Sequence, residues 1–411
     1  MTLHYIWGGF FILGFITAVV QYFLIGDIDV FKRMMDATFD ASRMAVMDIA
    51  LPLTGIMALW MGFLSVGEKA GAVRLLARIV GPFFNRLFPE IPKSHSVSGQ
   101  LLMNFSANML GLDNAATPLG LKAMQSLQEL NPDKEKASNA QIMFLTLNTS
   151  SLTIIPVTIL AQRGLLGAEN PADVFIPILI ATFCSTLAGL IYVAIRQKIS
   201  LFNIVIMGWI AGITIIMSAA VWYLSTLPKK EMESTVSLWS NGIIITIIMG
   251  FIAGGIYKKI NIFDSFIEGA KGGFETSIKI IPYLVAMLTG IAVFRAAGSL
   301  DIIMDGIRGF FSLFQVNTDF VEALPTALMK PLSGSGAKAM MIETMKTYGA
   351  DSFAGRLSCL FQGAADTTFY IIALYFGSVG IKNIRYSVSA GLIADLAGVI
   401  AGIIVAYFFF Y

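Results

Sequence analysis

The sequence predicts an all-α integral membrane protein made of two structural repeats. Of its 411 residues, 56% are hydrophobic and only 13% are charged. Soluble domains usually carry about 25% charged residues, so lipid must be the solvent for much of this surface. Several apolar runs approach the roughly 20 residues that a helix needs to cross the hydrocarbon core. The order of polar and apolar segments also repeats in the two halves of the chain.

Spanning helices are expected wherever a long apolar run contains few charges, because lipid offers no hydrogen bonds to an unpaired backbone. The alternating pattern of a membrane barrel is absent. The predicted spans are Tyr5–Ile25, Asp48–Val66, Gln141–Gln162, Val174–Ile195, Ile204–Leu224, Ser240–Tyr257, Ile280–Ala296, Leu357–Gly377 and Val388–Phe410.

Two amphipathic stretches, Phe31–Val46 and Gly71–Phe88, lie beside the spans of the first half. Each mixes charged residues with large apolar ones, a pattern typical of helices that lie in the plane of the membrane interface. Connecting helices packed on the bundle explain the pattern equally well.

The repeat is visible in the order of features along the chain. Phe31–Gly71 begins with a charged amphipathic stretch, continues through Pro52 and ends in an apolar run. Phe263–Gly298 has the same order, with Pro282 in the place of Pro52. Ile204–Leu224 has no counterpart and joins the halves.

We therefore predict a first repeat over residues 1–200, a linking helix and loop over 201–238, and a second repeat over 239–411. If each half makes four full crossings and its broken segment re-enters, the linking helix inverts the second half, as in many transporters. We expect this inverted arrangement. If the broken segments cross the membrane fully, the halves are parallel instead.

A broken, polar segment interrupts each half. Glycine adds backbone freedom and proline removes a hydrogen-bond donor, and broken helices at membrane depth leave backbone groups free to bind a ligand. The amides of a new helix can hold an anionic or polar group. An interfacial loop with a capped helix is the alternative. The candidates are Asn108, Asp113, Asn114 and Thr117 in the first segment, and Ser333 and Ser335 in the second.

Two predicted spans have polar centres, at Leu147–Pro156 and Phe361–Tyr370. Amides and hydroxyls at corresponding places of both repeats indicate a site at the repeat interface, although serine and threonine also serve in helix packing. The candidates for solute binding are Asn148, Thr149, Ser150, Gln362, Asp366 and Thr367.

Acidic residues within the spans are Asp366 and Asp395. A carboxylate at mid-bilayer costs about 2.5–3.5 kcal/mol, a cost tolerated where the group faces a cavity, binds a cation or carries a proton. Either aspartate is a candidate for coupling transport to protons or sodium. Structural pairing with a lysine such as Lys338 is the alternative.

At these segments the sequence resembles a known family. Asn108–Gly120 and Leu147–Ser151 are similar to spore maturation protein A, and Lys330–Ala337 and Phe361–Thr368 are similar to spore maturation protein B. Both are grouped with the nucleoside-recognition, or gate, domains, so the chain resembles a fusion of the two. The resemblance implies a transporter or permease with re-entrant hairpins. The resemblance suggests a nucleoside as the solute, although no feature of this sequence indicates recognition of a base or a ribose.

These observations favour a multi-pass protein of the inner (plasma) membrane that moves a small solute by alternating access. The alternative is a non-transporting component, such as a sensor or an assembly partner of envelope proteins. Two isolated cysteines and two distant histidines, with no metal or nucleophile motif, indicate that the protein is not an enzyme. We expect no cofactor, metal or nucleic-acid partner. The expected partners are the solute, the lipid bilayer and a coupling cation, and a homo-oligomer is a candidate.

Overall fold

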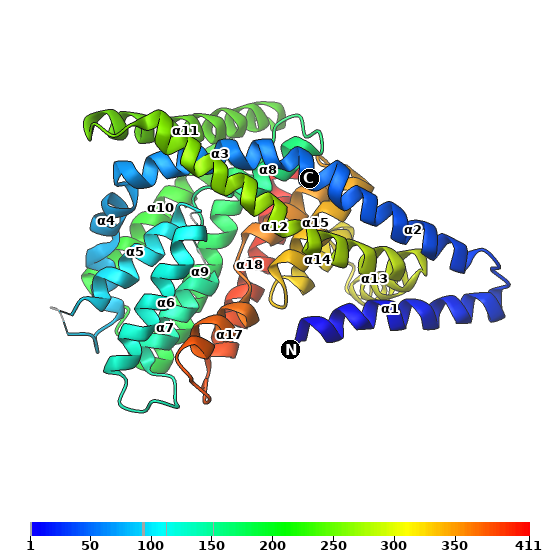
Figure 1. Cartoon of the computed structure of the whole chain (residues 1–411), viewed down its shortest axis with the longest axis horizontal. Helices are drawn as coiled ribbons and strands as arrows, with labels where there is room; N and C mark the ends of the chain where they lie inside the picture. The colour runs from blue at the N-terminus through cyan, green and yellow to red at the C-terminus, as the bar shows by residue number, and fades with distance from the viewer. Residues whose placement is uncertain (1, 93–94, 112, 151) are drawn as a thin grey trace.

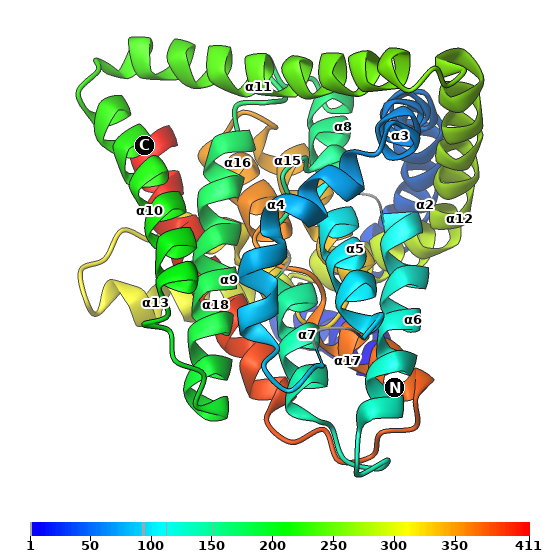
Figure 2. The same ribbon diagram turned by 90° about the vertical axis from the view of Figure 1, so that its left-hand side faces the viewer.

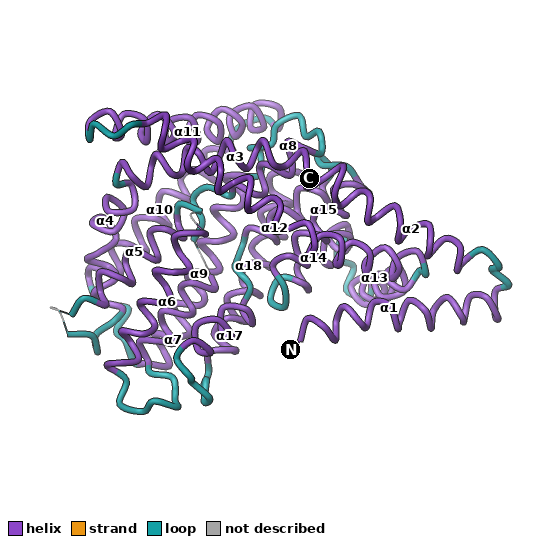
Figure 3. Tube along the Cα trace, viewed as in Figure 1, coloured by secondary structure: helices purple, strands orange, loops and turns teal. Residues whose placement is uncertain are grey.

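The computed structural model describes residues 2–92, 95–111, 113–150 and 152–411. Within these ranges, the side chains of residues 2–6, 25, 113–115, 118, 229, 276, 279, 280 and 283 lie outside the description. The described elements are helices (Figure 3), with an isolated parallel β-bridge between Lys136 and Asn383. The predicted all-α class is confirmed.

The first half contains helices that run to the end of α9. They are α1 (Thr2–Val20), α2 (Val30–Met44), α3 (Leu51–Ala70), α4 (Ala72–Leu87), α5 (Val97–Met109), α6 (Asp113–Leu130), α7 (Asn139–Ser150), α8 (Val157–Leu165) and α9 (Phe175–Gln197). Figure 1 shows α1 and α2 extending together to one side of the molecule.

After the link α10 (Ile204–Ser225), a second series of helices follows. They are α11 (Lys229–Tyr257), α12 (Ile262–Ala296), α13 (Ser299–Ser312), the 3₁₀ turn η3 (Asp319–Ala323), α14 (Leu324–Met329), α15 (Gly334–Tyr348), α16 (Phe353–Gly363), α17 (Thr368–Ser378) and α18 (Ser387–Phe410). Figure 2 shows α11 lying across the ends of α9 and α10.

In the described ranges, seven helical segments are long and apolar enough to cross a membrane, so the chain is a multi-pass membrane protein. One of them, Phe353–Ser378, consists of α16 and α17. Two predicted spans are not among these seven. Gln141–Gln162 is interrupted between α7 and α8. Ile280–Ala296 is the end of the longer α12, and its last part forms a pair with α13 that is bent by 71°.

The amphipathic stretch Phe31–Val46 is not a separate interfacial helix. It forms α2, which continues through the π-helical turn Ala45–Ala50 into α3, so that residues 30–70 are helical throughout. Pro52 is tolerated because a π-turn precedes it and loosens the hydrogen-bond ladder. The second predicted amphipathic stretch is α4, which begins after Gly71.

The same order of elements occurs twice. The long helix α2–α3 corresponds to α12, α4 corresponds to α13, and the hairpin α5–α6 corresponds to α14–α15. The pairs α7–α8 and α16–α17 correspond, as do α9 and α18, while α10 has no counterpart. The first helices are exchanged between the halves, because α1 packs on α12 and α11 packs on α3.

Corresponding helices pack antiparallel to each other, as inverted repeats require. In the α3–α12 pair, a Cβ built at Gly273 would lie 2.6 Å from the Met57 carbonyl oxygen, while Gly269, one turn earlier, faces Met61. In the α9–α18 pair, a Cβ at Gly189 would lie 3.2 Å from Ala394, and one at Gly398 would lie 3.3 Å from Ser185. In both pairs, residues later in one helix contact residues earlier in the other, so the helices are antiparallel and the halves are inverted.

Candidate functional site

Each half carries a helical hairpin whose tip lies against a broken helix of the same half. Hairpin 1 is α5–α6, with its turn at Gly111, and hairpin 2 is α14–α15, with its turn just before Gly334. Gly111 has a φ of +71°, and a Cβ there would lie 2.9 Å from the Ile155 carbonyl oxygen. A Cβ at Gly334 would lie 2.7 Å from the Thr367 hydroxyl. Only glycine permits both close approaches.

The two helices predicted to be continuous through polar centres are in fact broken at those centres. Break 1 lies between α7 and α8, with residues 152–156 in extended or bent backbone, and break 2 covers residues 364–367 between α16 and α17. Pro156 lacks an amide hydrogen. Threonine and aspartate in these segments offer side-chain hydrogen bonds that compete with the helical ladder. Sequence reasoning placed the breaks only in the hairpins.

Backbone groups freed at the breaks find partners in the hairpins and in each other. The amide of Ile154 donates to the Met109 carbonyl of hairpin 1 at 2.7 Å, and the amide of Phe369 donates to the Pro331 carbonyl of hairpin 2 at 3.0 Å. The amide of Asp366 donates to the Thr149 carbonyl at 2.6 Å, which joins break 2 to the end of α7. These bonds satisfy backbone that lipid cannot satisfy.

A polar cavity of about 360 Å³ lies where the two hairpins and the two breaks meet. Both halves contribute to its lining. Of the predicted binding residues, the lining includes Asn108, Thr117, Asn148, Gln362 and Asp366. The prediction that these residues come together at the repeat interface therefore agrees with the geometry, while their role in binding stays a prediction.

Asn148 is the centre of the hydrogen bonds on one side of the cavity. It is buried on α7, and its side-chain oxygen accepts a hydrogen bond of 2.7 Å from the amide nitrogen of Asn108. The Tyr375 hydroxyl donates to the same oxygen at 3.4 Å. The Asn148 nitrogen donates to the Phe144 carbonyl at 2.9 Å, as a helical back-bond. This network links hairpin 1, α7 and α17.

The charged groups of the cavity come from break 2 and hairpin 2. Asp366 lies in break 2, with its carboxylate accepting from the Thr367 amide at 2.7 Å. Lys330 and Lys338, both from hairpin 2, also line the cavity. Gln362 is only 8% exposed, and its side-chain oxygen has no partner among the described groups. A buried amide oxygen without a partner is uncommon in folded proteins.

Other predicted residues lie near the cavity but do not line it. Thr149 and Ser150 are fully buried on α7, and the carbonyl of Ser150 accepts bonds of 3.3 Å from Thr182 and Thr186 on α9. Thr367 is buried at the start of α17. These three residues support the broken helices and do not face the cavity.

The remaining predicted residues of the hairpins also have structural positions. Ser333 caps α15, with its hydroxyl accepting from the Gly336 amide at 3.0 Å, and the Ser335 hydroxyl lies 3.3 Å from it. Neither serine lines the cavity. Asp113 and Asn114 occupy the first turn of α6, and their side chains lie outside the described part of the structure.

Asp395 lies one layer behind the cavity, on α18. Its carboxylate accepts a hydrogen bond of 2.6 Å from the Thr368 hydroxyl at the start of α17, and its other oxygen has no partner among the described groups. It is 6% exposed, and both Lys330 and Asp366 lie within electrostatic range of it. Asp395 is therefore placed to respond to charge changes in the cavity without touching a solute.

Sequence reasoning missed Lys330 and Tyr375, which line the cavity, and Arg163, which joins the two repeats. Lys330 was quoted only as part of a motif, although a charge inside an apolar segment is itself a signal. Tyr375 stands in a wholly apolar run and gave no signal. Arg163 follows the end of a predicted span, and Asp351, one of its two acidic partners, lies far along the chain.

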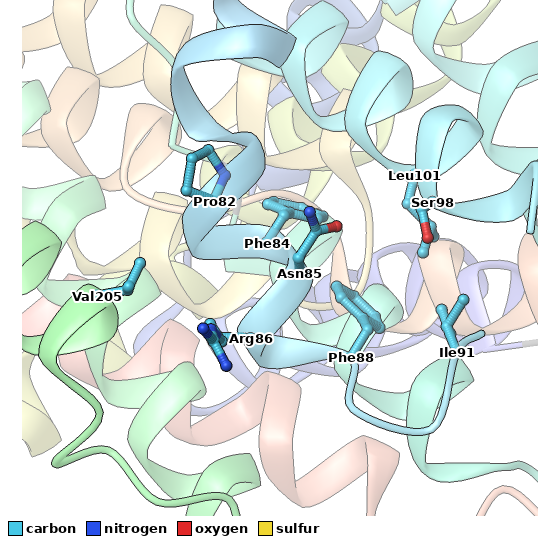
Figure 4. Close-up of a pocket in the computed structure, with 9 residues that line it drawn as sticks. All are labelled: Pro82, Phe84, Asn85, Arg86, Phe88, Ile91, Ser98, Leu101 and Val205. Carbon is cyan, nitrogen blue, oxygen red and sulfur yellow. The ribbon is translucent and has the colours of Figure 1, made fainter. Parts of the chain in front are cut away.

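A second hollow of about 370 Å³ lies on α4 and beside α5, near the start of α10 (Figure 4). Its lining is Pro82, Phe84, Asn85, Arg86, Phe88, Ile91, Ser98, Leu101 and Val205. It contains no predicted site residue and is lined by one repeat and the link alone. The cavity between the repeats is therefore the better candidate site.

Comparison with known proteins agrees with this geometry. Residues 50–166 and 277–382 match the family described as "Nucleoside recognition" (Gate), and each matched region contains one hairpin and one broken helix. The chain belongs to the Gate family. The two matches within one chain explain why this Gate protein has a hairpin and a break in each half.

Two curated relatives come from Bacillus subtilis (strain 168). Spore maturation protein B is 45% identical over 164 residues, which are 40% of this chain and 90% of that protein. Spore maturation protein A is 37% identical over 166 residues, which are 40% of this chain and 84% of that protein. The resemblance to both proteins is confirmed.

Proposed function

We propose that this Gate protein is a secondary transporter of the inner (plasma) membrane that moves a small polar solute by alternating access. The main support for this proposal is the polar cavity of about 360 Å³, which is lined by the hairpins and breaks of both inverted repeats. Inverted repeats with broken helices around a central site are a recurring transporter plan. The family description makes nucleosides the first class to test, with other small metabolites beside them.

Two sets of polar contacts, called clamp 1 and clamp 2, join the repeats. Opening one of them would let one half move against the other. Clamp 1 joins the α8–α9 loop to the α15–α16 loop. Arg163 binds Asp173 and Asp351 there at 2.8 Å each, and Arg356 binds Asp173 at 2.7 Å. Arg163 is fully buried, and the other members of this clamp are only partly exposed.

Clamp 2 joins the α6–α7 loop to the α17–α18 loop, the symmetry-related pair (Figure 2). Lys382 binds Glu135 at 2.6 Å, with both side chains mostly exposed. Arg385 donates to the Ala137 carbonyl at 3.0 Å. Exposed ion pairs contribute little, so we expect clamp 2 to open more readily than clamp 1.

The coupling ion is proposed to be a proton or sodium at Asp366, with Asp395 behind it. A carboxylate that lines a membrane cavity is a natural cation site. The alternative function, a sensor or assembly partner without transport, predicts a dry and closed centre between the repeats. The cavity favours transport over that alternative.

Uptake into proteoliposomes tests the proposal. The full chain should accumulate a solute from a panel of nucleosides, amino acids and small carboxylates, and empty liposomes should not. Asn148→Ala and Gln362→Ala should each reduce uptake by about tenfold or more, because each removes a polar group that lines the cavity. Asn85→Ala, at an exposed position on α4, is the control. Equal uptake by all three variants and the wild type would contradict the site.

A further inference from the structure

We propose that α4 binds anionic phospholipids of the cytoplasmic leaflet through Arg74, Arg78 and Arg86. This inference takes the inner-membrane location from the proposed function, but it goes beyond transport and does not depend on it. The three arginines are exposed and follow one another at spacings of four and eight residues, on the exposed side of the helix. Lipid phosphates are the anions that a membrane surface presents to such a helix.

The length and position of α4 place it at the membrane surface. It has 16 residues, so it is about 24 Å long and too short to cross a hydrocarbon core of about 30 Å. It begins just after Gly71, where the spanning segment Val30–Ala70 has ended. Leu75 and Ile79, which stand among the arginines, are 59% and 48% exposed. Exposed apolar residues beside exposed arginines are typical of helices in the lipid interface.

The three arginines of α4 form no ion pair with the described residues. Glu68 and Glu90 are the nearest carboxylates in sequence, and Glu90 accepts a hydrogen bond of 2.7 Å from the Asn139 side chain. The Lys258 ammonium lies against Gly71, at the start of α4. These four cations and two carboxylates leave the surface a formal charge of +2, which attracts anionic lipid.

The corresponding helix of the second repeat, α13, has the opposite charge balance. It contains Asp301, Asp305 and Arg308, and Arg308 is already paired with Asp305 and with Glu322. Packing on the bundle requires an amphipathic helix at this place in both repeats. It does not require three arginines without carboxylate partners in one repeat alone. The arginines of α4 therefore indicate a partner outside the fold.

The topology assigns α4 and α13 to opposite faces of the membrane. Both ends of a hairpin lie on one side, so α4 shares a face with the α6–α7 loop, and α13 shares the other with the α15–α16 loop. On the α13 side, the connections 26–29, 166–174, 226–228, 313–323 and 349–352 contain no lysine or arginine. On the α4 side, the connections contain Lys134, Lys136, Lys198, Lys258, Lys259, Lys382 and Arg385. The positive-inside rule makes the α4 side cytoplasmic, and the lipids of that leaflet give it a negative surface potential.

A hollow beside Arg86 offers room for part of a lipid molecule. It has a volume of about 370 Å³ and lies on α4 and beside α5, near the start of α10 (Figure 4). Arg86 is the charged residue among those that line it, and Phe84, Phe88 and Leu101 supply apolar surface. Basic pockets between membrane helices on the cytoplasmic side are typical sites for lipid headgroups. We assign the phosphate to Arg86 and the adjoining carbon atoms of the lipid to the apolar walls.

Lipid titrations of the full-length protein in detergent test this inference. Phosphatidylglycerol should raise the thermal unfolding midpoint more than phosphatidylcholine at the same mole fraction, and more than inorganic phosphate at equal ionic strength. The variant Arg74→Gln/Arg78→Gln/Arg86→Gln should weaken the apparent affinity for phosphatidylglycerol by about tenfold to a hundredfold, because each basic residue near a lipid surface contributes roughly a factor of five. Replacing the same three arginines by lysine should retain most of the affinity.

A second triple variant is the control for net charge. Lys136→Gln/Lys198→Gln/Lys259→Gln removes three exposed cations from the same face but none from α4, and it should bind phosphatidylglycerol within about twofold of the wild type. Arg86→Gln alone should weaken binding by about fivefold, and it replaces the triple arginine variant if that variant does not fold.

The leaflet is tested separately. Arg74→Cys, in a chain whose Cys184 and Cys359 are replaced by alanine, should react with a membrane-impermeant thiol reagent in inverted membrane vesicles. The same variant should not react in intact cells, because α4 lies on the cytoplasmic side.

Three results would overturn the inference. One is that phosphatidylcholine or inorganic phosphate stabilises the protein as much as phosphatidylglycerol does. Another is an equal loss of affinity in both triple glutamine variants, which would indicate general attraction to the whole face. A third is reaction of the Arg74→Cys variant in intact cells. None of these measurements involves solute uptake, so each result leaves the proposed transport function to be judged by the proteoliposome experiment.

Discussion

At the residue scale, amides within apolar sequence were the signals that pointed to the cavity. Asn148 and Gln362 line it, as their polarity within predicted spans suggested. Thr149 and Ser150 stand beside Asn148 in sequence but face away from the cavity. Sequence cannot separate these neighbours, because adjacent helical residues point in different directions and the break changes the register. Tyr375 lies at the site only because the hairpins pack against the broken helices, and this packing cannot be seen in the sequence.

Asp366 carries the coupling prediction. Asp366→Asn should abolish uptake driven by a proton or sodium gradient, because the cation loses its carboxylate. Exchange of solute across the membrane without a gradient should persist, since the cavity keeps its shape. The measurement is paired gradient-driven and exchange flux in proteoliposomes.

Asp305→Asn, at an exposed carboxylate on α13, is the matched control for this variant. It should leave both fluxes unchanged. If Asp366→Asn retains full gradient-driven uptake, the coupling role belongs elsewhere.

At the scale of elements, long apolar helices were predictable and their interruptions were not. The seven spanning helices of the described ranges coincide with predicted runs. The breaks were not predicted because the apolar sequence on both sides of each break favours a continuous helix. The hydrogen-bond partners of the backbone at the breaks lie on distant elements. Met109, for example, accepts from Ile154, and Thr149 accepts from Asp366. Such pairings depend on the tertiary fold and leave no local pattern.

The crossing of α3 and α12 gives a stability prediction. Gly273→Ala should destabilise the protein by about 1–3 kcal/mol, because overpacking a close helix crossing forces backbone apart. The new methyl would lie 2.6 Å from the Met57 carbonyl oxygen and 2.8 Å from the Ala58 Cα. Thermal unfolding of the purified protein measures the effect.

Gly272→Ala, one residue earlier on α12, provides the comparison. A Cβ there meets no atom within 4 Å, so helix propensity alone should raise stability by up to about 1 kcal/mol. Equal effects of the two alanines would show that the helices do not cross at Gly273.

At the scale of the whole molecule, the repeat was predictable, and its inverted direction was an expectation that the sequence could not decide. Whether the broken segments cross the membrane or re-enter decides between parallel and inverted halves. Composition does not distinguish these two arrangements. The antiparallel packing of α3 with α12 and of α9 with α18 decides for inversion. The boundaries predicted at 200 and 239 stay a prediction, and α11 begins earlier, at Lys229.

The two clamps are predicted to differ in strength. Arg163→Met should destabilise the protein by about 1–3 kcal/mol, because Asp173 and Asp351 lose a buried cation that pairs with both, while Arg356 still pairs with each of them. Lys382→Met, in clamp 2, should cost less than about 1 kcal/mol because the pair with Glu135 is exposed. Unfolding midpoints of the two variants in detergent compare them directly. Similar losses in both would remove the basis for expecting clamp 2 to open first.

The central claim is that the cavity between the repeats opens to water on alternate sides of the membrane. Gln362→Cys, in a chain whose Cys184 and Cys359 are replaced by alanine, tests it with membrane-impermeant thiol reagents applied to either face of oriented vesicles. Leu288→Cys, at a buried packed position on α12, is the control. The account predicts that the cysteine at 362 reacts from both faces while the one at 288 reacts from neither. Reaction at 362 from neither face would contradict the claim.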